Sequence, residues 1–588
     1  MNNKSVFILS SSSLIGLAFL FPIDEVSTLS TNFIWALLTV PTYLLFKTTI
    51  PYLSKRTMVL AELPSLLLST VMKISRDLKI YGSLEYSAIA FFKNIFLITL
   101  SSFFFCFLFI FLFNNVYKIS EKKSENPICR IIFLKLLLLF IVVWFPILLI
   151  FWPGIFSYDT PMQFYELATN QITNHHPIIH SLLMNIVIII GNKTGNFNDG
   201  ALIYTVFQFL ICSSISAYVC SRTSNLRINR YAYCLVLLYY LLFPLNMLFP
   251  FVATKDVLFS SFFFLLVFKL IEKATTDNHL GKKDIAELVL IIILVGIFRN
   301  NAIYAIIATI PPLFIFRRTN KKNRIFLISF LIASVLTLGI NTSLRAVTSA
   351  KSGMEGQMYS VPLQQLARSY VENPGSFNND EKKRMFSYVP EKNLKNYNPR
   401  ISDYVKSYFT FKNKGNSKKD FLKLWLSIGV KNKKNYVDAF LMLSQGYWDP
   451  GFHFPDKYYK LPIIELWSKE TVLGDTFHEA SKAPEIREKI IYSFDNSQVY
   501  KKIPYLSLLF SPGFVFWIIL IFFFYALYVR AKKLYFIFFF LLMYYGTLIL
   551  GPVTLVRYAY PYMLLWPIIG LTLFNYPVRS NMRDTTKV

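Results

Sequence analysis

The sequence predicts an all-α polytopic membrane protein, and its composition, its apolar runs and the placement of its basic residues each support this class. Of its 588 residues, 54% are hydrophobic and 16% are charged, whereas about 25% of residues in soluble domains are charged. Apolar runs recur along the chain, and about 20 such residues suffice to cross a bilayer. Of the net charge of +28, +19 lies outside the segment 343–508 and chiefly in short loops, which indicates retention of basic residues in the cytoplasm rather than a nucleic-acid partner.

About thirteen or fourteen transmembrane helices are expected. The clear apolar runs lie at 6–22, 31–47, 90–114, 130–152, 201–221, 231–250, 256–271, 285–298, 301–316, 325–342, 509–529, 534–551 and 558–575. The run 57–72 is interrupted by Glu62 and Pro64, and it decides between the two counts. The short run 177–191 contains His180 and Asn185, which favours a helix that lies in the outer interface or re-enters it.

The basic loops orient these helices, since lysine and arginine are enriched on the cytoplasmic side. The short loops 115–130, 222–230, 272–284, 317–324 and 530–533 each carry a cluster of lysines and arginines and are therefore predicted to be cytoplasmic, as is the C-terminus. The loops 153–200 and 343–508 then lie outside the cell. The side on which the N-terminus lies depends on whether 57–72 crosses the membrane.

Four parts of the chain follow from this pattern. They are N-terminal transmembrane segments at 1–129, a transmembrane core with an external loop at 130–342, an external soluble domain at 343–508, and C-terminal transmembrane helices with a basic cytoplasmic tail at 509–588. The external domain is long enough for a core of its own. Its apolar periodicity predicts helices at 361–373, 401–410, 420–445 and 477–493.

The external loop 153–200 contains the first candidate site. Asp159 follows a transmembrane helix, where apolar surroundings would raise the pKa of its carboxyl group and favour a role as proton acceptor. It is equally suited to cap a helix that starts with Pro161 at the first helical position. His175 and His176 follow in the same loop, where they would bind a divalent metal ion together with Asp159, orient a phosphate, or cap the next helix.

Cations at the external ends of helices form a second candidate group. Lys255 and Asp256 close the loop PFVATKD, Arg299 and Asn300 lie in the turn FRNNA, and Arg557 precedes the last apolar run. Cations on the outer side run against the usual charge bias, so together they predict a receptor for an anionic lipid headgroup. Snorkelling to the interface, or a pair between Lys255 and Asp256, is the alternative explanation.

The external domain adds amide and aromatic side chains that suit sugar binding. Gln364, Gln365 and Arg368 share one predicted helix, and the segment QGYWDPGFHF supplies Tyr447, Trp448 and His453. The same residue types also serve ordinary helix packing. No serine nucleophile motif, phosphate-binding glycine loop or dinucleotide fingerprint is present in the sequence.

An ordered set of motifs carries a resemblance to known proteins. The motifs are PGIFSYD followed by Gln163, NHHPIIH, ATKDVLF, FRNNAIY, SVPLQQLARSYVEN, YNPRISDYVK, GYW and GPVTLVRYAYP, spread over residues 130–575. They resemble a family of polytopic membrane proteins of unassigned function that is common in Gram-positive bacteria. The layout is also similar to that of the GT-C membrane glycosyltransferases, although many of those enzymes carry two adjacent acidic residues where this chain has Asp159 alone.

The GT-C resemblance implies an activity. Asp159 corresponds to the catalytic acidic position, and Lys255, Arg299 and Arg557 lie where these enzymes hold a lipid-linked phosphate. The implied enzyme, in the bacterial plasma membrane with its site facing outside, transfers a hexose or pentose from a polyprenyl-phosphate sugar to a cell-envelope polymer or glycolipid, with a divalent metal as an optional cofactor. A lipid-linked glycan flippase and another envelope-polymer transferase or polymerase are the alternatives.

Overall fold

The computed structural model describes residues 2–20, 28–84, 87–121, 132–157, 159–224, 230–276, 278–318, 321–411, 417–452, 480–497, 499 and 506–576. Over these ranges the regular structure is helical, and the only β-type pairing consists of isolated bridges such as Ile155 with Val252. The predicted all-α class is therefore confirmed for the described part of the chain. The basic tail after residue 576 and His453 lie outside it.

Every predicted apolar run coincides with a helix or with a pair of helices. The corresponding helices are α1 (Asn3–Leu20), α2 (Thr28–Thr49), α3 (Lys55–Tyr81), α4 (Ala88–Glu121), α5 (Phe133–Ile150), α8 (Phe197–Ser224), α9 (Arg230–Leu242) with α10 (Pro244–Leu248), α11 (Lys255–Thr275), α12 (Lys282–Phe298), α13 (Ala302–Phe316), α14 (Lys321–Val347), α23 (Pro512–Tyr528), α24 (Tyr535–Ile549) and α25 (Val556–Phe574). Among the described residues, six helices are long and apolar enough to cross a membrane, or seven if the bent pair α9–α10 is one span. This is the construction of an integral membrane protein.

The interrupted run 57–72 belongs to α3, which is one of these six helices. Ser54 caps its first turn by accepting a hydrogen bond from the Thr57 backbone N–H at 3.2 Å. Gly82 ends it in a left-handed conformation with a φ of 67°, a conformation that glycine adopts without steric cost. Pro64 is accommodated within the helix. The glutamate and proline that interrupt the apolar pattern therefore do not prevent a long helix from forming.

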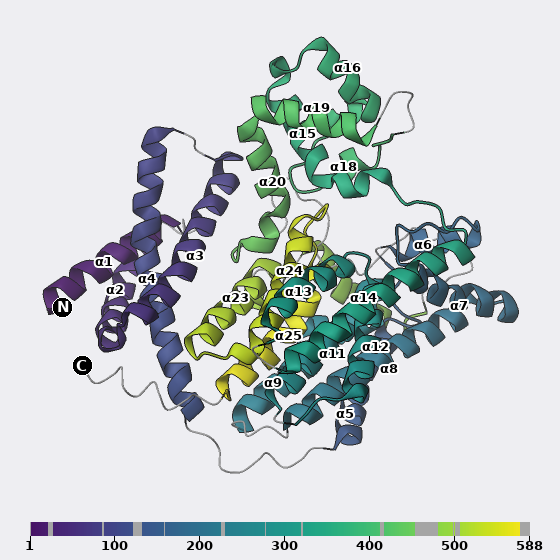
Figure 1. Ribbon diagram of the computed structural model, residues 1–588, viewed down its shortest axis with the longest axis horizontal. Coiled ribbons are helices and arrows are strands. Elements are labelled where there is room, and N and C mark those ends of the chain that lie inside the picture. Colours follow the sequence, from purple (N-terminus) through teal and green to yellow (C-terminus); the bar gives the residue numbers. More distant parts are fainter. Residues whose placement is uncertain are drawn as a thin grey trace.

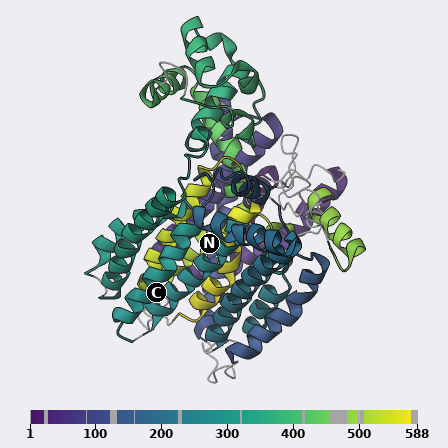
Figure 2. The same cartoon turned by 90° about the vertical axis from the view of Figure 1, so that its right-hand side faces the viewer.

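The transmembrane-type helices share one extensive apolar core. It joins side chains of α4, α5, α8, α9, α11 to α14 and α23 to α25, and α11 lies deep within it. Figure 1 shows this bundle in the centre of the molecule, with α1 to α4 on one flank and the shorter helices α6 (Thr160–Ala168) and α7 (Ile178–Thr194) on the other. Figure 2 shows the same bundle from its side. Neighbouring helices therefore hold α11 in place along most of its length.

A second apolar core forms a helical domain, which we define as Ser360–Trp448, at one end of the bundle (Figure 1). Its helices are α15 (Ser360–Glu372), α16 (Asn379–Tyr388), α17 (Glu391–Lys395), α18 (Asp403–Lys406), α19 (Lys418–Lys431) and α20 (Lys433–Trp448). The helix predicted at 361–373 is confirmed as α15. Between residues 480 and 509 lie α21 (Pro484–Ile491), a π-turn at Tyr492–Asn496 and α22 (Leu506–Leu509).

The other predicted helices of this region differ from those observed. The predicted helix 401–410 shrinks to the single turn α18, and 420–445 is divided by Asn432 into α19 and α20. The side-chain amide of Asn432 donates to Ile428 O at 3.2 Å and to Ser376 Oγ at 2.8 Å, so it draws the chain out of the helix here. The prediction at 477–493 holds only for α21 within the described residues.

Four contacts join the helical domain to the loop before α25. The backbone N–H of Ser402 donates to Pro552 O at 3.0 Å, and Ile401 forms an antiparallel bridge with Val553. The hydroxyl of Tyr447 donates to Val553 O at 3.2 Å and accepts from the Leu555 N–H at 3.3 Å. Arg557 follows directly, so the domain supports the backbone that positions this arginine.

Candidate functional site

Two loops pair to form the base of the candidate site. The N–H of Ile155 donates to Phe251 O at 2.9 Å, and the N–H of Ala253 donates to Ile155 O at 2.8 Å. From α8, the amide of Gln208 donates to Pro250 O at 3.0 Å and to Val252 O at 2.8 Å. These bonds satisfy buried backbone groups and bring the start of α6 against the start of α11. Asp159 and Lys255 are thereby brought together from opposite sides of the pairing.

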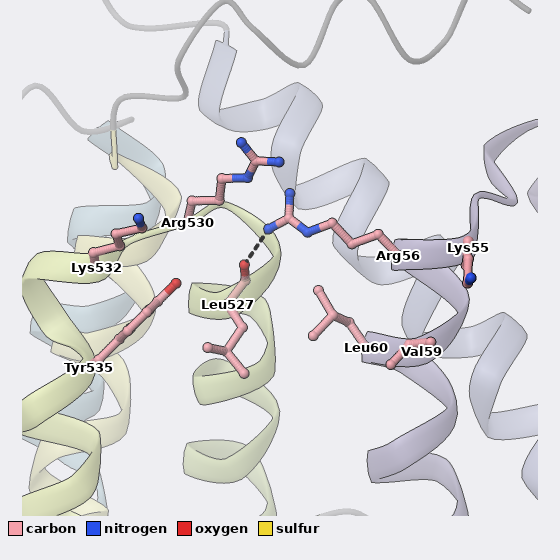
Figure 3. A pocket seen from close by; sticks show the side chains of 8 residues that line it. All are labelled: Lys55, Arg56, Val59, Leu60, Leu527, Arg530, Lys532 and Tyr535. Atoms are coloured by element: carbon pink, nitrogen blue, oxygen red, sulfur yellow. Dashed lines mark hydrogen bonds between the residues drawn. The ribbon is translucent and has the colours of Figure 1, made fainter.

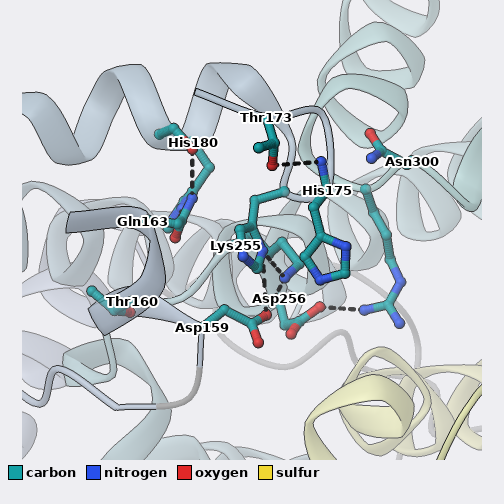
Figure 4. Close-up of polar contacts among 12 residues, drawn as sticks. Asp159, Thr160, Gln163, Thr173, His175, His180, Lys255, Asp256 and Asn300 are labelled. Atoms are coloured by element: carbon teal, nitrogen blue, oxygen red, sulfur yellow. Dashed lines mark hydrogen bonds and ion pairs between the residues drawn. The ribbon is translucent and has the colours of Figure 1, made fainter. Parts of the chain in front are cut away.

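Asp159 precedes α6 but does not cap it. Its carboxylate makes no capping hydrogen bond and instead accepts a hydrogen bond from Lys255 Nζ (Figure 4). The other carboxylate oxygen lies 3.4 Å from Arg557 Nη2, and His176 Nδ1 lies 3.9 Å from the first. Of the two interpretations of Asp159 that the sequence allows, the structure thus rejects helix capping. The carboxylate retains 23% of its exposure, so it is open to a ligand.

The expected upward shift of the Asp159 pKa is wrong. Burial acts to raise the pKa, but the charges of Arg557 and Lys255 outweigh it and hold the pKa of Asp159 well below its usual value. A carboxylate this close to two cations is stabilised in its charged form. Asp159 is therefore ionised at neutral pH and is a weak base as long as both cations contact it.

A second ion pair lies beside the first. Arg299, at the end of α12, donates from Nη1 to Asp256, and Arg557 Nε lies 3.6 Å from the other oxygen of Asp256. The predicted alternative of a Lys255–Asp256 pair is therefore wrong. These two residues are the first of α11, and successive side chains on a helix point in directions about 100° apart. Each thus meets a different partner.

Tyr558 packs between the two arginines. Its ring centroid is 4.5 Å from the guanidinium carbon of Arg299 and 5.1 Å from that of Arg557. Phe259 adds a further aromatic face, 5.3 Å from Arg299. Arg299 and Arg557 are 7% and 5% exposed, so the aromatic rings replace much of their hydration. Such contacts hold a guanidinium in place without neutralising it.

The two histidines lie on a loop that the segment after α14 holds in position. Lys351 N–H donates to Ile172 O at 3.0 Å, Asn174 N–H donates to Lys351 O at 2.9 Å, and Gly353 N–H donates to Asn174 Oδ1 at 2.6 Å. Asn300 donates to Asn174 O at 3.2 Å from the turn after α12. In Figure 4 His175 extends toward Lys255 and Asp256.

Both imidazoles are neutral at neutral pH. Burial, reinforced by Lys255, lowers the pKa of His175 and holds the pKa of His176 well below its usual value. His176 Nδ1 lies 3.3 Å from Lys255 Nζ, whereas its Nε2 is buried and has no hydrogen-bond partner among the described residues.

One known protein family matches the chain. The family of unknown function DUF6020 matches residues 166–587, which is more than half of the chain. The chain belongs to this family. The match includes both histidines, Lys255, Arg299 and Arg557, and it begins seven residues after Asp159. No curated protein and no solved structure matches the chain.

In this member of DUF6020, the residues around Asp159 do not fit a divalent metal ion. No group of three or more His, Cys, Asp or Glu side chains in the described part of the chain is arranged to hold one. Lys255 Nζ already contacts both Asp159 and His176. An ion bound there would face the cations Lys255 and Arg557, so the metal alternative for Asp159, His175 and His176 does not fit this arrangement.

Four of the predicted sugar-binding residues of the helical domain are engaged in packing. Gln364 donates to Asn398 O at 2.9 Å, Gln365 donates to Tyr436 O at 3.1 Å, and Arg368 donates to Gly82 O at 2.8 Å. Trp448 donates to Ser444 Oγ at 3.0 Å. These contacts favour the packing interpretation for Gln364, Gln365, Arg368 and Trp448.

Three supporting residues of this site are absent from the sequence-based candidates. Thr160 donates from its hydroxyl to Ala253 O, which fixes the start of α6. The amide of Gln163 lies 2.9 Å from Ser181 Oγ and 3.0 Å from His180 Nδ1, which joins α6 to α7. Tyr558 contacts both arginines. Its position directly after Arg557 is the one signal in the sequence that points to it.

Proposed function

We propose that the protein is a GT-C-type membrane glycosyltransferase that uses a polyprenyl-phosphate sugar as donor. The observation that carries this proposal is the convergence of Asp159, Lys255 and Arg557 from three distant parts of the chain, next to the pair of Asp256 and Arg299. With both histidines neutral, three cations and two carboxylates leave one net positive charge. A sugar phosphodiester carries one negative charge and would neutralise the site.

The donor would also activate the base. A phosphate group competes with Asp159 for Lys255 and Arg557, because both carboxylate and phosphate oxygens accept hydrogen bonds from these cations. As the cations turn to the phosphate, the pKa of Asp159 rises in its buried surroundings. The carboxylate then takes the proton of an acceptor hydroxyl. Base strength and donor binding are linked in this scheme, so Asp159 is held inactive until the donor arrives.

The transfer itself is a single displacement. The acceptor oxygen forms a bond to the anomeric carbon as the bond from that carbon to the phosphate oxygen breaks, and the acceptor proton passes to Asp159. The polyprenyl phosphate gains a second negative charge as it leaves. Fixed guanidinium groups favour this state over the ground state because the charge increases along the reaction. Inversion at the anomeric carbon follows from one displacement.

The acceptor in this scheme is a hydroxyl of an envelope polymer or glycolipid on the outer side of the bacterial plasma membrane. The orientation rests on the basic loops 222–230, 272–284 and 530–533, which would lie in the cytoplasm. The helical domain would then project outside, above the outer leaflet, where envelope polymers lie. The shorter apolar helices of the bundle would cross the membrane together with the six long ones, which would bring the total to about thirteen or fourteen.

The location of the charges favours chemistry at an interface over transport. Asp159, Lys255, Asp256 and Arg299 lie at helix ends, and Arg557 is the second residue of α25. Transporters more often hold their ionisable residues near the bilayer midplane. A flippase is therefore the less supported alternative, whereas a transferase for another envelope group shares the need for a base and an anion site.

The test uses the purified full-length protein in lipid nanodiscs with a panel of polyprenyl-phosphate sugars and an envelope glycan extract. Release of polyprenyl phosphate should appear with at least one donor and should fall at least about a hundredfold in Asp159→Asn. Asp199→Asn, which changes an acidic residue in the first turn of α8 outside the site, is the matched control. No release with any donor, or equal release by Asp159→Asn, would contradict the proposal, and sugar-lipid translocation without release would support the flippase.

A further inference from the structure

A pocket of about 690 Å³ opens between α3 and the turn that joins α23 to α24 (Figure 3). Its lining consists of four basic residues, one tyrosine and three aliphatic residues: Lys55, Arg56, Val59, Leu60, Leu527, Arg530, Lys532 and Tyr535. The two walls come from segments more than 460 residues apart in the chain. Its volume is within the range of ligand pockets, and none of its residues belongs to the proposed catalytic site.

The pocket is strongly electropositive. It is lined by four cations, and no aspartate or glutamate of the described residues lines it. Lys55 and Arg56 are the first two residues of α3, a 27-residue helix, and Lys532 lies in the short turn directly before α24. Helix N-terminal ends carry partial positive charge, so cations there are unfavourable unless an anion is close. The arrangement thus favours a bound anion.

One of the four cations also has a structural role. Arg56 Nη2 donates to Leu527 O at 2.8 Å and to Tyr528 O at 3.1 Å, the last carbonyls of α23. Figure 3 shows the hydrogen bond between Arg56 and Leu527 at the centre of the pocket, with Arg530 beside it. Lys55, Arg530 and Lys532 are exposed at the rim. Arg56 therefore fixes the two walls together, and the other three cations are available to a ligand.

The order of residues along the walls matches an amphiphile. On α3 the aliphatic Val59 and Leu60 lie one turn further into the helix than Lys55 and Arg56. On the other wall Leu527 lies within α23, whereas Arg530 lies just beyond the end of that helix. With the loop 530–533 in the cytoplasm, as its basic sequence predicts, the charged groups would face water and the aliphatic groups would lie toward the bilayer core. A free anion would need only the charged residues, whereas a lipid would contact the charged residues with its headgroup and the aliphatic residues with its acyl chains.

We propose that this pocket binds the headgroup of an anionic phospholipid of the inner leaflet. The phosphate would contact Lys55, Arg530 and Lys532, while the first part of the acyl chains would lie along Val59, Leu60 and Leu527. The loop 530–533 is predicted to be cytoplasmic from its basic sequence, which gives the leaflet. This site is independent of the proposed catalytic activity. It lies at the opposite end of α3 from the helical domain, which the segment just after α3 contacts through the hydrogen bond from the Leu84 N–H to Asp438.

The experiment measures lipid retention by the full-length protein in detergent, using native mass spectrometry with phosphatidylglycerol or phosphatidylcholine of identical acyl chains. Phosphatidylglycerol should be retained at lower concentration than phosphatidylcholine. In Arg530→Gln/Lys532→Gln its affinity should fall about 25-fold, since each basic residue near a lipid surface contributes roughly fivefold. The control Lys282→Gln/Lys283→Gln removes the same charge from exposed positions at the start of α12 and should have no effect.

Three results would overturn the proposal. Equal loss in both double variants would mean that only net charge matters, and equal retention of the two lipids would mean that the headgroup is not recognised. Displacement of phosphatidylglycerol by millimolar inorganic phosphate would identify a site for free anions. If the double variant does not fold, as judged by gel filtration and melting temperature, the single variant Lys55→Gln tests the same pocket with an expected fivefold loss.

Discussion

Arg557 joins the two carboxylates of the site, because its Nε lies 3.6 Å from Asp256 Oδ2 while its Nη2 lies 3.4 Å from Asp159 Oδ1. A single guanidinium is thus shared between an aspartate that is fully buried and one that is partly exposed. Lysine has one point of positive charge and cannot reach both groups in this way. The site depends on the shape of this side chain as well as on its charge.

We therefore expect Arg557→Lys to fold but to lose most of its donor affinity, and Arg557→Ala to be destabilised by about 3–5 kcal/mol, the usual effect of removing one partner of a buried pair. Thermal unfolding in detergent and polyprenyl-phosphate release measure the two effects. Arg345→Ala, an exposed arginine near the end of α14, is the control. Full donor affinity in Arg557→Lys would show that charge alone suffices.

Stability should depend on pH through His176. The pKa of His176 is lowered in the folded protein, so below the ordinary histidine pKa of about 6.5 the unfolded chain binds a proton that the folded chain does not. The free energy of unfolding is therefore unaffected by His176 above about pH 6.5. Below that pH it falls as the pH decreases, by up to about 1.4 kcal/mol per pH unit for each such group. His176→Gln should reduce the slope of melting temperature between pH 7 and 5, whereas His279→Gln, at an exposed position, should not. An unchanged slope in His176→Gln would mean that His176 is not neutral in the folded state.

Asp159 should behave in the opposite manner. Its lowered pKa stabilises the folded protein above the ordinary carboxyl pKa of about 3.9, and this contribution is lost only as the pH falls through the lower folded value. Between pH 7 and 5 Asp159 therefore adds nothing to the slope of melting temperature against pH. Asp159→Asn should therefore leave the slope of melting temperature in this range unchanged while lowering the melting temperature itself. A change of slope above pH 5 would contradict the assigned direction of the pKa shift.

Gly353 permits the close approach that positions the histidine loop. A Cβ atom at this residue would lie 2.9 Å from both Cα and Cβ of His175. Gly353→Ala should consequently displace the loop and destabilise the protein by about 1–3 kcal/mol, as overpacking commonly does. Gly375→Ala is a matched control because nothing lies within 4 Å of its added Cβ. Equal melting temperatures for the two variants would show that the loop adapts without cost.

The ring of Tyr558 should matter more than its hydroxyl. Tyr558→Phe preserves the aromatic face that lies 4.5 Å from Arg299, so donor affinity should change less than threefold. Tyr558→Leu removes that face and should weaken donor binding by roughly two- to thirtyfold, the range expected for a cation–π contact. Equilibrium binding of a labelled polyprenyl-phosphate sugar checks both. A larger loss in the phenylalanine variant would assign the main contribution to the hydroxyl.

Much of the helical framework could be predicted from the sequence because apolar runs report burial directly. The helices α16 and α17 were not predicted, since α16 is rich in charged residues and offers few apolar positions. A signal for α16 does exist: Asn378 and Glu381 form a capping box, with Glu381 N–H donating to Asn378 Oδ1 at 2.8 Å. Such a box is readable as Asn followed three residues later by Glu. Local capping motifs would thus have supplemented the hydrophobic pattern.

The members of the site were predictable, but their partners were not. Asp159, Lys255, Arg299 and Arg557 each stood out as charged residues at the ends of apolar runs. The identity of each ion pair, however, depends on the direction in which α11 begins, and that direction is set by the pairing of Ile155 with Val252. The same limit explains the incorrect direction of the Asp159 pKa, because neighbouring charges decide it once they are within about 4 Å.

The bonds from Ser402 to Pro552 and from Tyr447 to Val553 have a thermodynamic consequence. If the protein is the proposed glycosyltransferase, a polymer that docks on the helical domain and shifts it would also shift the segment that carries Arg557, and would so alter the affinity for the lipid-linked sugar. Linkage requires the effect to be reciprocal, with the bound sugar changing the affinity for the polymer by the same factor. The two substrates of such an enzyme would bind cooperatively although they never share a side chain.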